Sequence, residues 1–171
     1  MDNIELQNKC TTCENDECIC YKKNNFSTNI NYIKLKENTI EPTRGSTNAA
    51  GYDLYAAIEN PIIIPAHSTV KIGTGLAFAL PDNTFAAIFA RSGLATKQGL
   101  RPANCVGVCD SDYRGEYIVA VHNDTNEKKV IEPNERIAQM VLMPYIPMIF
   151  EEVESLDETE RGEDGFGSTG V

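Results

Sequence analysis

The chain has 171 residues, 42% of them hydrophobic, which is enough for one domain with a sizeable core. Its net charge of −10 argues against non-specific binding to nucleic acid or to an anionic membrane surface. No apolar run approaches the ~20 residues of a membrane-spanning helix, and the polar start MDNIELQNKC is unlike a signal or transit peptide. We therefore expect an intracellular protein, cytoplasmic or nuclear, that acts on neither nucleic acid nor membrane.

Residues 1–28 form a polar segment that is rich in Asn, Lys and Cys and has no periodic pattern. Its cysteines are arranged as C-x-x-C followed by C-x-C, at Cys10, Cys13, Cys18 and Cys20. Four thiolates can bind zinc, but this spacing is cramped and no Cys/His pair follows at the spacing of a zinc finger. We expect a disordered extension, with a metal site as the alternative.

From residue 29 to residue 153 the chain consists of short strand-like runs separated by turn sequences such as PAHS, PDN and NDTNE. Only residues 93–99 predict a helix, of about two turns. Many short strands at regular spacing predict an all-β domain, a jelly-roll-like barrel or sandwich. The expected strands lie at 30–35, 52–57, 61–64, 69–80, 84–90, 116–123, 128–133, 136–144 and 146–153.

The densest group of polar and turn residues is NCVGVCDSDYRGE, residues 104–116. We expect a hairpin here, with VGVC and EYIVAV around the DSDYRG turn. Free backbone groups where its strands separate can pair with the edge of a nucleobase, and fixed donors and acceptors distinguish uracil from cytosine. Asp110 or Asp112 could activate a water beside a metal-bound triphosphate, or simply punctuate a turn. Tyr113 could pack against a sugar or fill the core, and we expect Cys105 and Cys109 to be small buried hydrophobic residues.

Three further motifs carry polar residues among apolar ones. In FARSGLATKQG a strand delivers Arg91 and Ser92 to the start of a short helix, where phosphate binds readily; a helix cap with a surface arginine is the alternative. Asp53 in AAGYDLYAA needs an arginine, backbone donors or a hydrated metal as its partner if it is buried. In NERIAQMVL, Arg136 and Gln139 interrupt an apolar strand and should meet partners across the sheet, and Gln139 could reach a phosphate.

Residues 154–171 comprise an acidic linker and a Gly-rich tail that ends in RGEDGFGSTGV. Glycine loses the most conformational entropy on ordering, so a frayed terminus is one interpretation of this tail. Its cation, aromatic ring, hydroxyls and glycine N–H groups also suit a ligand with a flat ring and phosphates. We therefore expect a lid that orders over a bound nucleotide.

Five motifs in this order, AGYDLYA, RSGLA, GVCDSDYRGE, ERIAQM and RGEDGFGSTG, resemble those of the homotrimeric dUTPases from about residue 32 to residue 171. The resemblance implies a jelly-roll-like β-barrel with one short helix per subunit, in a homotrimer with three shared active sites. It also implies Mg²⁺-dependent attack of water on the α-phosphorus of dUTP, giving dUMP and diphosphate. That reaction keeps uracil out of DNA and supplies dUMP for thymidylate synthesis.

The same resemblance assigns roles to individual residues. Asp110 matches the carboxylate that activates the water, and Tyr113 matches the ring beneath the deoxyribose. Asp53 matches an acid that helps to hold the hydrated Mg²⁺. The remaining matches are the uracil site, at Asn104, Gly107 and Val108; the phosphate contacts, at Arg91, Ser92, Gly93 and Gln139; and the tail contacts, at Arg161, Phe166, Gly167, Ser168 and Thr169.

Two other functions are alternatives to this one. A deaminase of the dCTP deaminase kind would have Ser at Gly93 and a catalytic Glu at Ala120, and alanine cannot transfer protons. A nucleotide-sensing protein would bind dUTP to regulate a partner and would not hydrolyse it. An assay of diphosphate release distinguishes such a protein from an enzyme.

Overall fold

The structure is a computed structural model that describes residues 27–165. The chain divides into two units, Met1–Ile30 and Asn31–Val171, and every strand and helix of the described residues belongs to the second. The four N-terminal cysteines lie outside the described residues. The expected disorder of residues 1–28 and its alternative, a metal site, therefore stay predictions.

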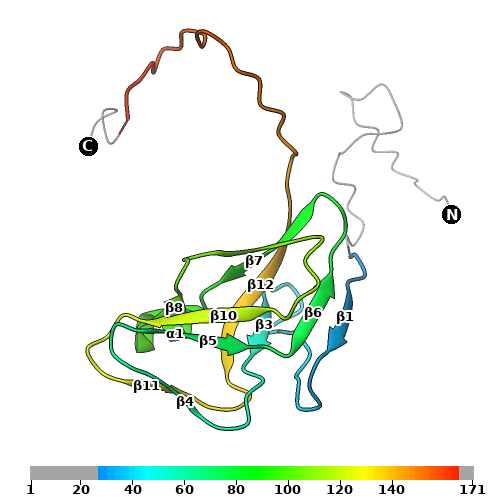
Figure 1. The fold of residues 1–171 in the computed structure, drawn as a ribbon, viewed down its shortest axis with the longest axis vertical. Coiled ribbons are helices and arrows are strands. Elements are labelled where there is room, and N and C mark those ends of the chain that lie inside the picture. The colour runs from blue at the N-terminus through cyan, green and yellow to red at the C-terminus, as the bar shows by residue number, and fades with distance from the viewer. Residues whose placement is uncertain (1–26, 166–171) are drawn as a thin grey trace, which may run out of the picture. The chain divides into compact units, whose positions relative to one another are not determined.

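Twelve strands and one helix form within the described residues (Figure 1). Hydrogen bonds join the strands into four sheets, ordered β1-β6, β5-β10-β8, β11-β4 and β2-β3-β12-β7-β9. The elements are β1 (Asn31–Lys34), β2 (Thr43–Arg44), β3 (Tyr52–Tyr55), β4 (Ile62–Ile64), β5 (Thr69–Gly73), β6 (Leu76–Ala79), β7 (Thr84–Phe89), α1 (Ser92–Gln98), β8 (Leu100–Pro102), β9 (Gly107–Asp110), β10 (Ile118–Asn123), β11 (Lys129–Ile131) and β12 (Arg136–Pro144).

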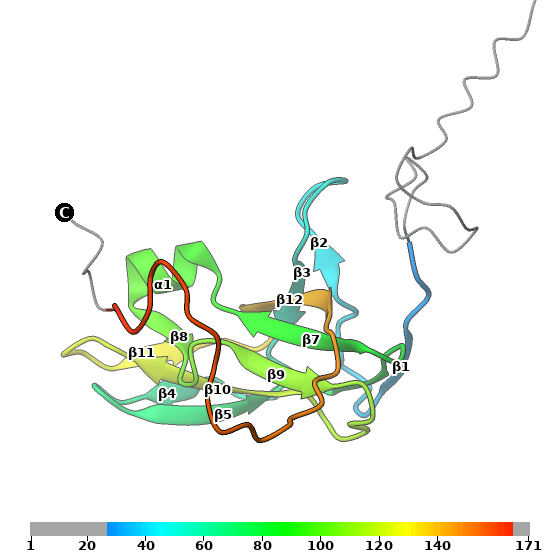
Figure 2. The ribbon, with the colours of Figure 1, turned by 90° about the horizontal axis from the view of Figure 1, so that it is seen from above.

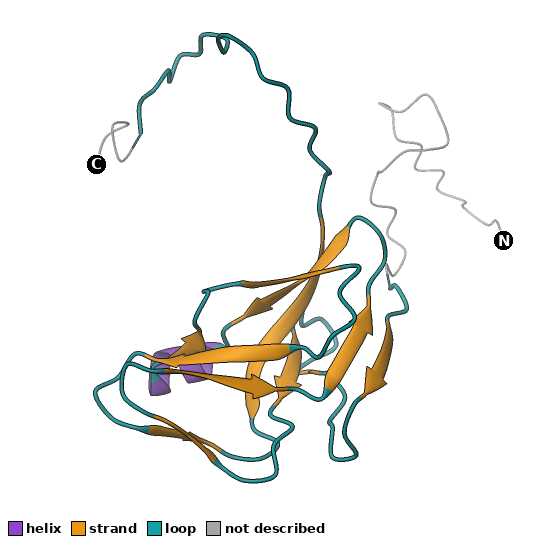
Figure 3. Ribbon diagram, in the orientation of Figure 1, coloured by secondary structure: helices purple, strands orange, loops and turns teal. Residues whose placement is uncertain are grey.

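The predicted all-β class with one short helix is confirmed, as the colouring by secondary structure makes plain (Figure 3). Alternation along the strands directs every second side chain inward, as in β10, where Val119, Val121 and Asn123 are buried. The core is filled by aliphatic side chains from six different strands: Leu54, Ile64, Ile72, Leu76, Val121 and Ile131. Burial of this apolar surface is the main force that holds the sheets together.

The predicted hairpin around residues 104–116 is wrong. β9 pairs with β7, whereas β10 pairs with β5 and β8, so the DSDYRG turn connects two different sheets (Figure 2). The backbone of Tyr117 explains the change of sheet. Its N–H donates to Leu76 O (2.8 Å) and its carbonyl accepts from Thr74 N (3.1 Å), which commits the chain to the β5–β6 side before β10 begins.

The strand expected at residues 146–153 is also wrong, because residues 145–165 contain no strand. The side chains of Ile146, Ile149 and Phe150 are 87%, 97% and 86% exposed. A strand needs a partner for its backbone groups, and this segment has none among the described residues. The apolar pattern of residues 146–153 therefore corresponds to an exposed apolar segment and not to a strand.

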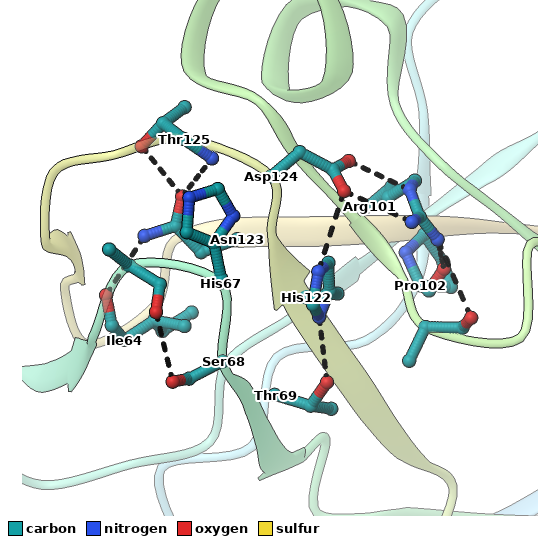
Figure 4. Close-up of polar contacts among 12 residues, drawn as sticks. Ile64, His67, Ser68, Thr69, Arg101, Pro102, His122, Asn123, Asp124 and Thr125 are labelled. Atoms are coloured by element: carbon teal, nitrogen blue, oxygen red, sulfur yellow. Dashed lines mark hydrogen bonds and ion pairs between the residues drawn. The ribbon is translucent and has the colours of Figure 1, made fainter.

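Asn123, at the end of β10, is the buried polar residue that organises one end of the domain (Figure 4). Its amide nitrogen donates to the carbonyls of Ile64 (3.1 Å), Pro65 (3.1 Å) and Glu127 (2.7 Å). Its amide oxygen accepts from the N–H of Thr125 (3.0 Å) and from its hydroxyl (2.8 Å). The side chain thus satisfies backbone groups where β4, β10 and β11 meet.

Across residues 27–165, no helix is long and apolar enough to span a membrane.

Candidate active site

A cavity of about 440 Å³ lies where three separated parts of the chain meet. β3 contributes Asp53, the β7–α1 junction contributes Arg91, Ser92 and Gly93, and β12 contributes Gln139. β12 lies between β3 and β7, and Gln139 is in register with both Asp53 and Phe89. The pairing of these strands therefore assembles the five residues, all of which the sequence had singled out. We call this cavity the phosphate pocket, after the ligand that we propose for it below.

Asp53 is the buried carboxylate at the centre of the phosphate pocket. Its Oδ1 accepts a hydrogen bond from Arg91 Nε (2.7 Å), and its Oδ2 accepts one from Arg136 Nη1 (3.2 Å). This confirms that the buried carboxylate has an arginine partner. Two guanidinium groups against one carboxylate leave an excess of one positive charge, which suits an anionic ligand.

Arg136 and Gln139 meet partners across the sheet, as predicted. Gln139 Nε2 donates to the carbonyl of Ala90 (2.9 Å), just before the turn that carries Arg91. A Cβ at Gly51 would collide with Gln139 Oε1, so a larger residue there would require the Gln139 amide to shift. Arg136 was expected only to find a partner, yet it lines the pocket. A permanent charge inside an apolar strand was the signal for its role.

The start of helix α1 forms the rim of the phosphate pocket. Arg91 is the N-cap residue, with φ −83° and ψ 131°, and its side chain does not cap the helix. Ser92 is the first helical residue, so the capping serine considered above is not found. Ser92 and Gly93 are both exposed at the rim, and no atom lies within 4 Å of the place a Gly93 side chain would occupy. This leaves the backbone open to a ligand.

β9 carries a second group of the predicted residues on an open edge of the five-stranded sheet. Val108 and Asp110 are exposed and alternate with the partly buried Gly107 and Cys109. Only one edge of β9 pairs with a strand of the described region, through β7. The N–H and C=O groups of the other edge are therefore available to a ligand.

Asn104 and Tyr113 flank β9 and are both exposed. The Asn104 amide nitrogen is 3.6 Å from the place a side chain at Gly107 would occupy. The Tyr113 hydroxyl donates to the carbonyl of Glu116 (3.1 Å), and its ring lies so close to Gly115 that any side chain there would collide with it. Tyr113 thus presents a ring on the surface and does not fill the core.

The two cysteines of this region differ from each other in burial. Cys105 is exposed and has a left-handed backbone, with φ 63°, because it closes a tight turn. Cys109 is partly buried, and this burial raises the pKa of its thiol, with a further contribution from the neighbouring charge of Asp110. The expectation that both are buried is therefore wrong for Cys105.

Asp110 lies at the far end of β7 from the phosphate pocket, whereas Gly107, at the start of β9, is in register with Ile88 close to that pocket. Asp110 is in register with Phe85, whereas the phosphate pocket begins at Phe89 and Arg91. Four residues of strand span about 13 Å, before the two further residues to Arg91 are added. The fold of this one chain therefore does not bring Asp110 to the pocket.

In the tail, Arg161 is exposed and its Nε donates to the carbonyl of Asp164 (2.8 Å). Phe166, Gly167, Ser168 and Thr169 lie outside the described residues. Within the part of the chain that is described, no group of three or more His, Cys, Asp and Glu side chains could hold a metal ion by itself.

The dUTPase family model matches residues 37–170 of the chain. A deoxyuridine 5'-triphosphate nucleotidohydrolase from Desulfitobacterium hafniense (strain DSM 10664 / DCB-2) is 47% identical over 149 residues, which cover 86% of this chain and 99% of the relative.

Solved structures have the same fold. A mutant of Staphylococcus bacteriophage 80alpha dUTPase, with dUpNHpp, gives a TM-score of 0.77 at 25% identity, over 85% of this chain and 100% of its own. A mutant dUTPase from phage phi11 of S. aureus, whose structure shows the coordination of a structural Mg(II) ion, gives a TM-score of 0.68 at 21% identity. The match covers 75% of this chain and 98% of the phage protein.

Proposed function

The chain belongs to the dUTPase family, and from this premise we propose that it hydrolyses dUTP to dUMP and diphosphate. The observation that carries the proposal is the phosphate pocket. Three sequence-distant motifs of the family meet there around Asp53 and two arginines. A cavity of this size with an excess positive charge suits the triphosphate of a nucleotide.

The phosphate chain binds at the β7–α1 junction in this proposal. Arg91 and Arg136 supply the positive charge, while Ser92, the Gly93 N–H and Gln139 donate hydrogen bonds to phosphate oxygens. Gln139 already donates to Ala90, and its second amide hydrogen remains for a ligand. These groups orient the α-phosphorus for attack.

Uracil and deoxyribose bind along β9. The open edge of β9 at Gly107 and Val108 offers backbone donors and acceptors to the base, and Asn104 adds its amide. The Tyr113 ring lies flat against the deoxyribose and leaves no room for a 2′-hydroxyl. A water molecule loses a proton to Asp110 as its oxygen bonds to the α-phosphorus. The bond from that phosphorus to the bridging oxygen breaks, and diphosphate leaves.

Mg²⁺ fits the phosphate pocket only as a hydrated ion carried by the triphosphate. Both carboxylate oxygens of Asp53 already accept hydrogen bonds from arginine, but each keeps a lone pair for a metal-bound water. Mg²⁺ commonly keeps several waters and binds substrate phosphates, where it neutralises the charge of the leaving diphosphate. Asp53 would thus hold the ion through water.

We propose that the active site is shared between subunits of a homotrimer. Asp110 and the phosphate pocket are separated along β7 in one subunit, so one nucleotide needs β9 of one chain and the pocket of another. The exposed apolar side chains of residues 146–156 add a surface suited to burial between subunits.

The tail and the N-terminal segment complete the proposal. Residues 154–171 form the linker and a lid, in which Phe166 covers uracil and Arg161, Gly167, Ser168 and Thr169 contact the terminal phosphates. Residues 29–153 form the catalytic domain, and residues 1–28 form a Cys-rich extension outside the residues that match the family. The protein acts inside the cell on free nucleotides.

Diphosphate release from dUTP, UTP, dCTP and dTTP, measured with and without Mg²⁺, tests the proposal. We expect turnover of dUTP only, and only with Mg²⁺. Absence of dUTP turnover, or equal turnover of UTP, would overturn it. Asp110→Asn should keep dUTP binding and lose nearly all turnover, whereas the matched variant Asp112→Asn, two residues further on in the turn, should stay active.

A further inference from the structure

Arg101, at the centre of β8, makes a set of contacts that the proposed reaction does not use (Figure 4). Its Nε and Nη2 donate to the two carboxylate oxygens of Asp124, at 2.8 and 3.0 Å. Both side chains are partly exposed, at 35% and 44%. Isolated surface ion pairs contribute little, but this one is bidentate and belongs to a network, the circumstances in which such pairs matter.

The third nitrogen of Arg101 faces the loop that follows β8. Nη1 donates to the carbonyls of Pro102 (3.2 Å) and Ala103 (3.4 Å) and lies 4.0 Å from the sulfur of Cys105. One guanidinium group therefore joins Asp124 to the turn of residues 102–105. Asn104, assigned above to the uracil site, lies within this turn.

The turn that carries Asn104 has a backbone that needs external support. Cys105 N–H donates to Pro102 O (3.1 Å), Val106 N–H donates to Asn104 O (2.7 Å), and Cys105 has φ 63°. A non-glycine residue rarely adopts such a left-handed backbone conformation unless its surroundings fix it. Arg101 supplies two of the contacts that fix it.

Asp124 is itself held in place by its neighbours. Its N–H donates to the carbonyl of Gly99, at the end of helix α1 (2.9 Å). His122 lies between Asp124 and Thr69, with Nε2 3.4 Å from Asp124 Oδ1 and Nδ1 2.9 Å from Thr69 Oγ1. The hydrogen bonds from Arg101 hold the pKa of Asp124 below its usual value, so the carboxylate stays charged. The anchor of Arg101 is thus tied to the rigid β5–β10 pair.

We propose that Arg101 is a positioning residue for base recognition, which holds the Asn104 turn against β9, and that Asp124 acts through Arg101. This inference rests on the proposed function, because it assigns Arg101 and Asp124 to the support of the uracil site although neither residue contacts the ligand. The two residues touch neither the phosphate pocket nor the outer edge of β9. Their loss should weaken contacts to the base and leave those to phosphate unchanged.

Binding of dUMP and of diphosphate, measured separately by calorimetry on the full chain, tests the proposal. Arg101→Gln should raise the Kd for dUMP about tenfold, because a hydrogen bond to a charged group contributes about this factor. It should change the Kd for diphosphate by less than about twofold. Asp124→Asn should act in the same direction. It should add nothing when combined with Arg101→Gln, because it acts through the same group.

Lys71→Gln is the matched control, since it removes one exposed positive charge from β5, on the far side of β10 in the same sheet. It should leave both constants unchanged. If Arg101→Gln weakens dUMP and diphosphate binding by the same factor, or neither, the positioning role is wrong. Arg101→Lys separates charge from geometry. It keeps the charge without the fork, so a wild-type Kd for dUMP in this variant would also contradict the proposal.

Asn104→Ala distinguishes a failure of this inference from a failure of the proposed function. If Asn104→Ala weakens dUMP binding and Arg101→Gln does not, only the role of Arg101 is wrong. If the wild-type chain binds no dUMP, the base site itself is wrong, and the support assigned to Arg101 is wrong with it.

Discussion

Replacement of Asp53 by asparagine should measurably destabilise the folded protein. Asparagine has nearly the volume of aspartate but offers one acceptor oxygen and one donor group. Asp53 accepts from Arg91 on one oxygen and from Arg136 on the other. In either amide orientation, one guanidinium group therefore faces N–H donors and loses its partner.

The magnitude follows from the burial of the three groups. Removing one partner of a fully buried ion pair costs about 3–5 kcal/mol, and a hydrogen bond to a charged group contributes about 1.5–3 kcal/mol. The Asp53 side chain is 13% exposed and that of Arg91 25%, but that of Arg136 is 50% exposed and can regain water. We therefore expect Asp53→Asn to cost about 2 kcal/mol per subunit, which lowers Tm by about 4–8 °C.

Thermal unfolding followed by circular dichroism, without nucleotide and at one fixed protein concentration, measures this cost, because ligand and subunit binding both shift Tm. Asp82→Asn is the matched control, since it makes the same change at an exposed turn residue. If Asp53→Asn lowers Tm no more than Asp82→Asn does, the carboxylate does not hold the two arginines as described.

Three further outcomes are expected. Gly115→Ala should push the Tyr113 ring out of place, lower kcat/KM for dUTP about tenfold and narrow the preference for dUTP over UTP. Tyr117→Phe removes a buried hydroxyl that has no hydrogen-bond partner in the described chain, so stability at neutral pH should not fall. In the folded protein, burial and, as the next cause, the Cys109 thiol raise the pKa of the Tyr117 hydroxyl above its ordinary value of 10.0. As the pH rises, the hydroxyl therefore loses its proton in the unfolded chain before it does so in the folded protein. The wild type should therefore lose stability above about pH 10, where the Phe variant loses less, as urea unfolding across pH 8–11 would measure. Deleting residues 161–171 should leave Tm nearly unchanged and abolish turnover; a truncated protein that unfolds would instead make the tail structural.

The sequence predicted the strands well where the local pattern alone decides them. Alternation in residues 117–122 and apolar runs such as 84–90 correspond to β10 and β7. It failed where pairing is non-local. A hairpin around Asp110 was expected because its two strands are close together in the sequence. Instead, β9 and β10 join different sheets, since Tyr117 forms hydrogen bonds with β6 and with the turn that precedes it. No local pattern encodes such a choice of partner.

The candidate site was predictable in its residues and not in its geometry. The charges at Asp53 and Arg136 interrupt apolar strands, so they had to meet partners, and the structure pairs them. That Arg101 supports the Asn104 turn could not be inferred, because its contacts depend on the left-handed Cys105 and on Asp124. The strand expected at 146–153 failed for a related reason, since its apolar side chains are exposed and find no cover among the described residues of the chain.

Complementation between two inactive variants tests the shared site most directly. Asp110→Asn removes the proposed base and Arg91→Ala removes a phosphate contact, on groups that lie at opposite ends of β7. If each site takes β9 from one chain and the pocket from another, random co-refolding of the two variants gives about a quarter of the sites both intact groups. We predict that the mixture regains about a quarter of wild-type dUTP turnover, while each variant refolded alone stays inactive. A mixture as inactive as its components would contradict the shared site.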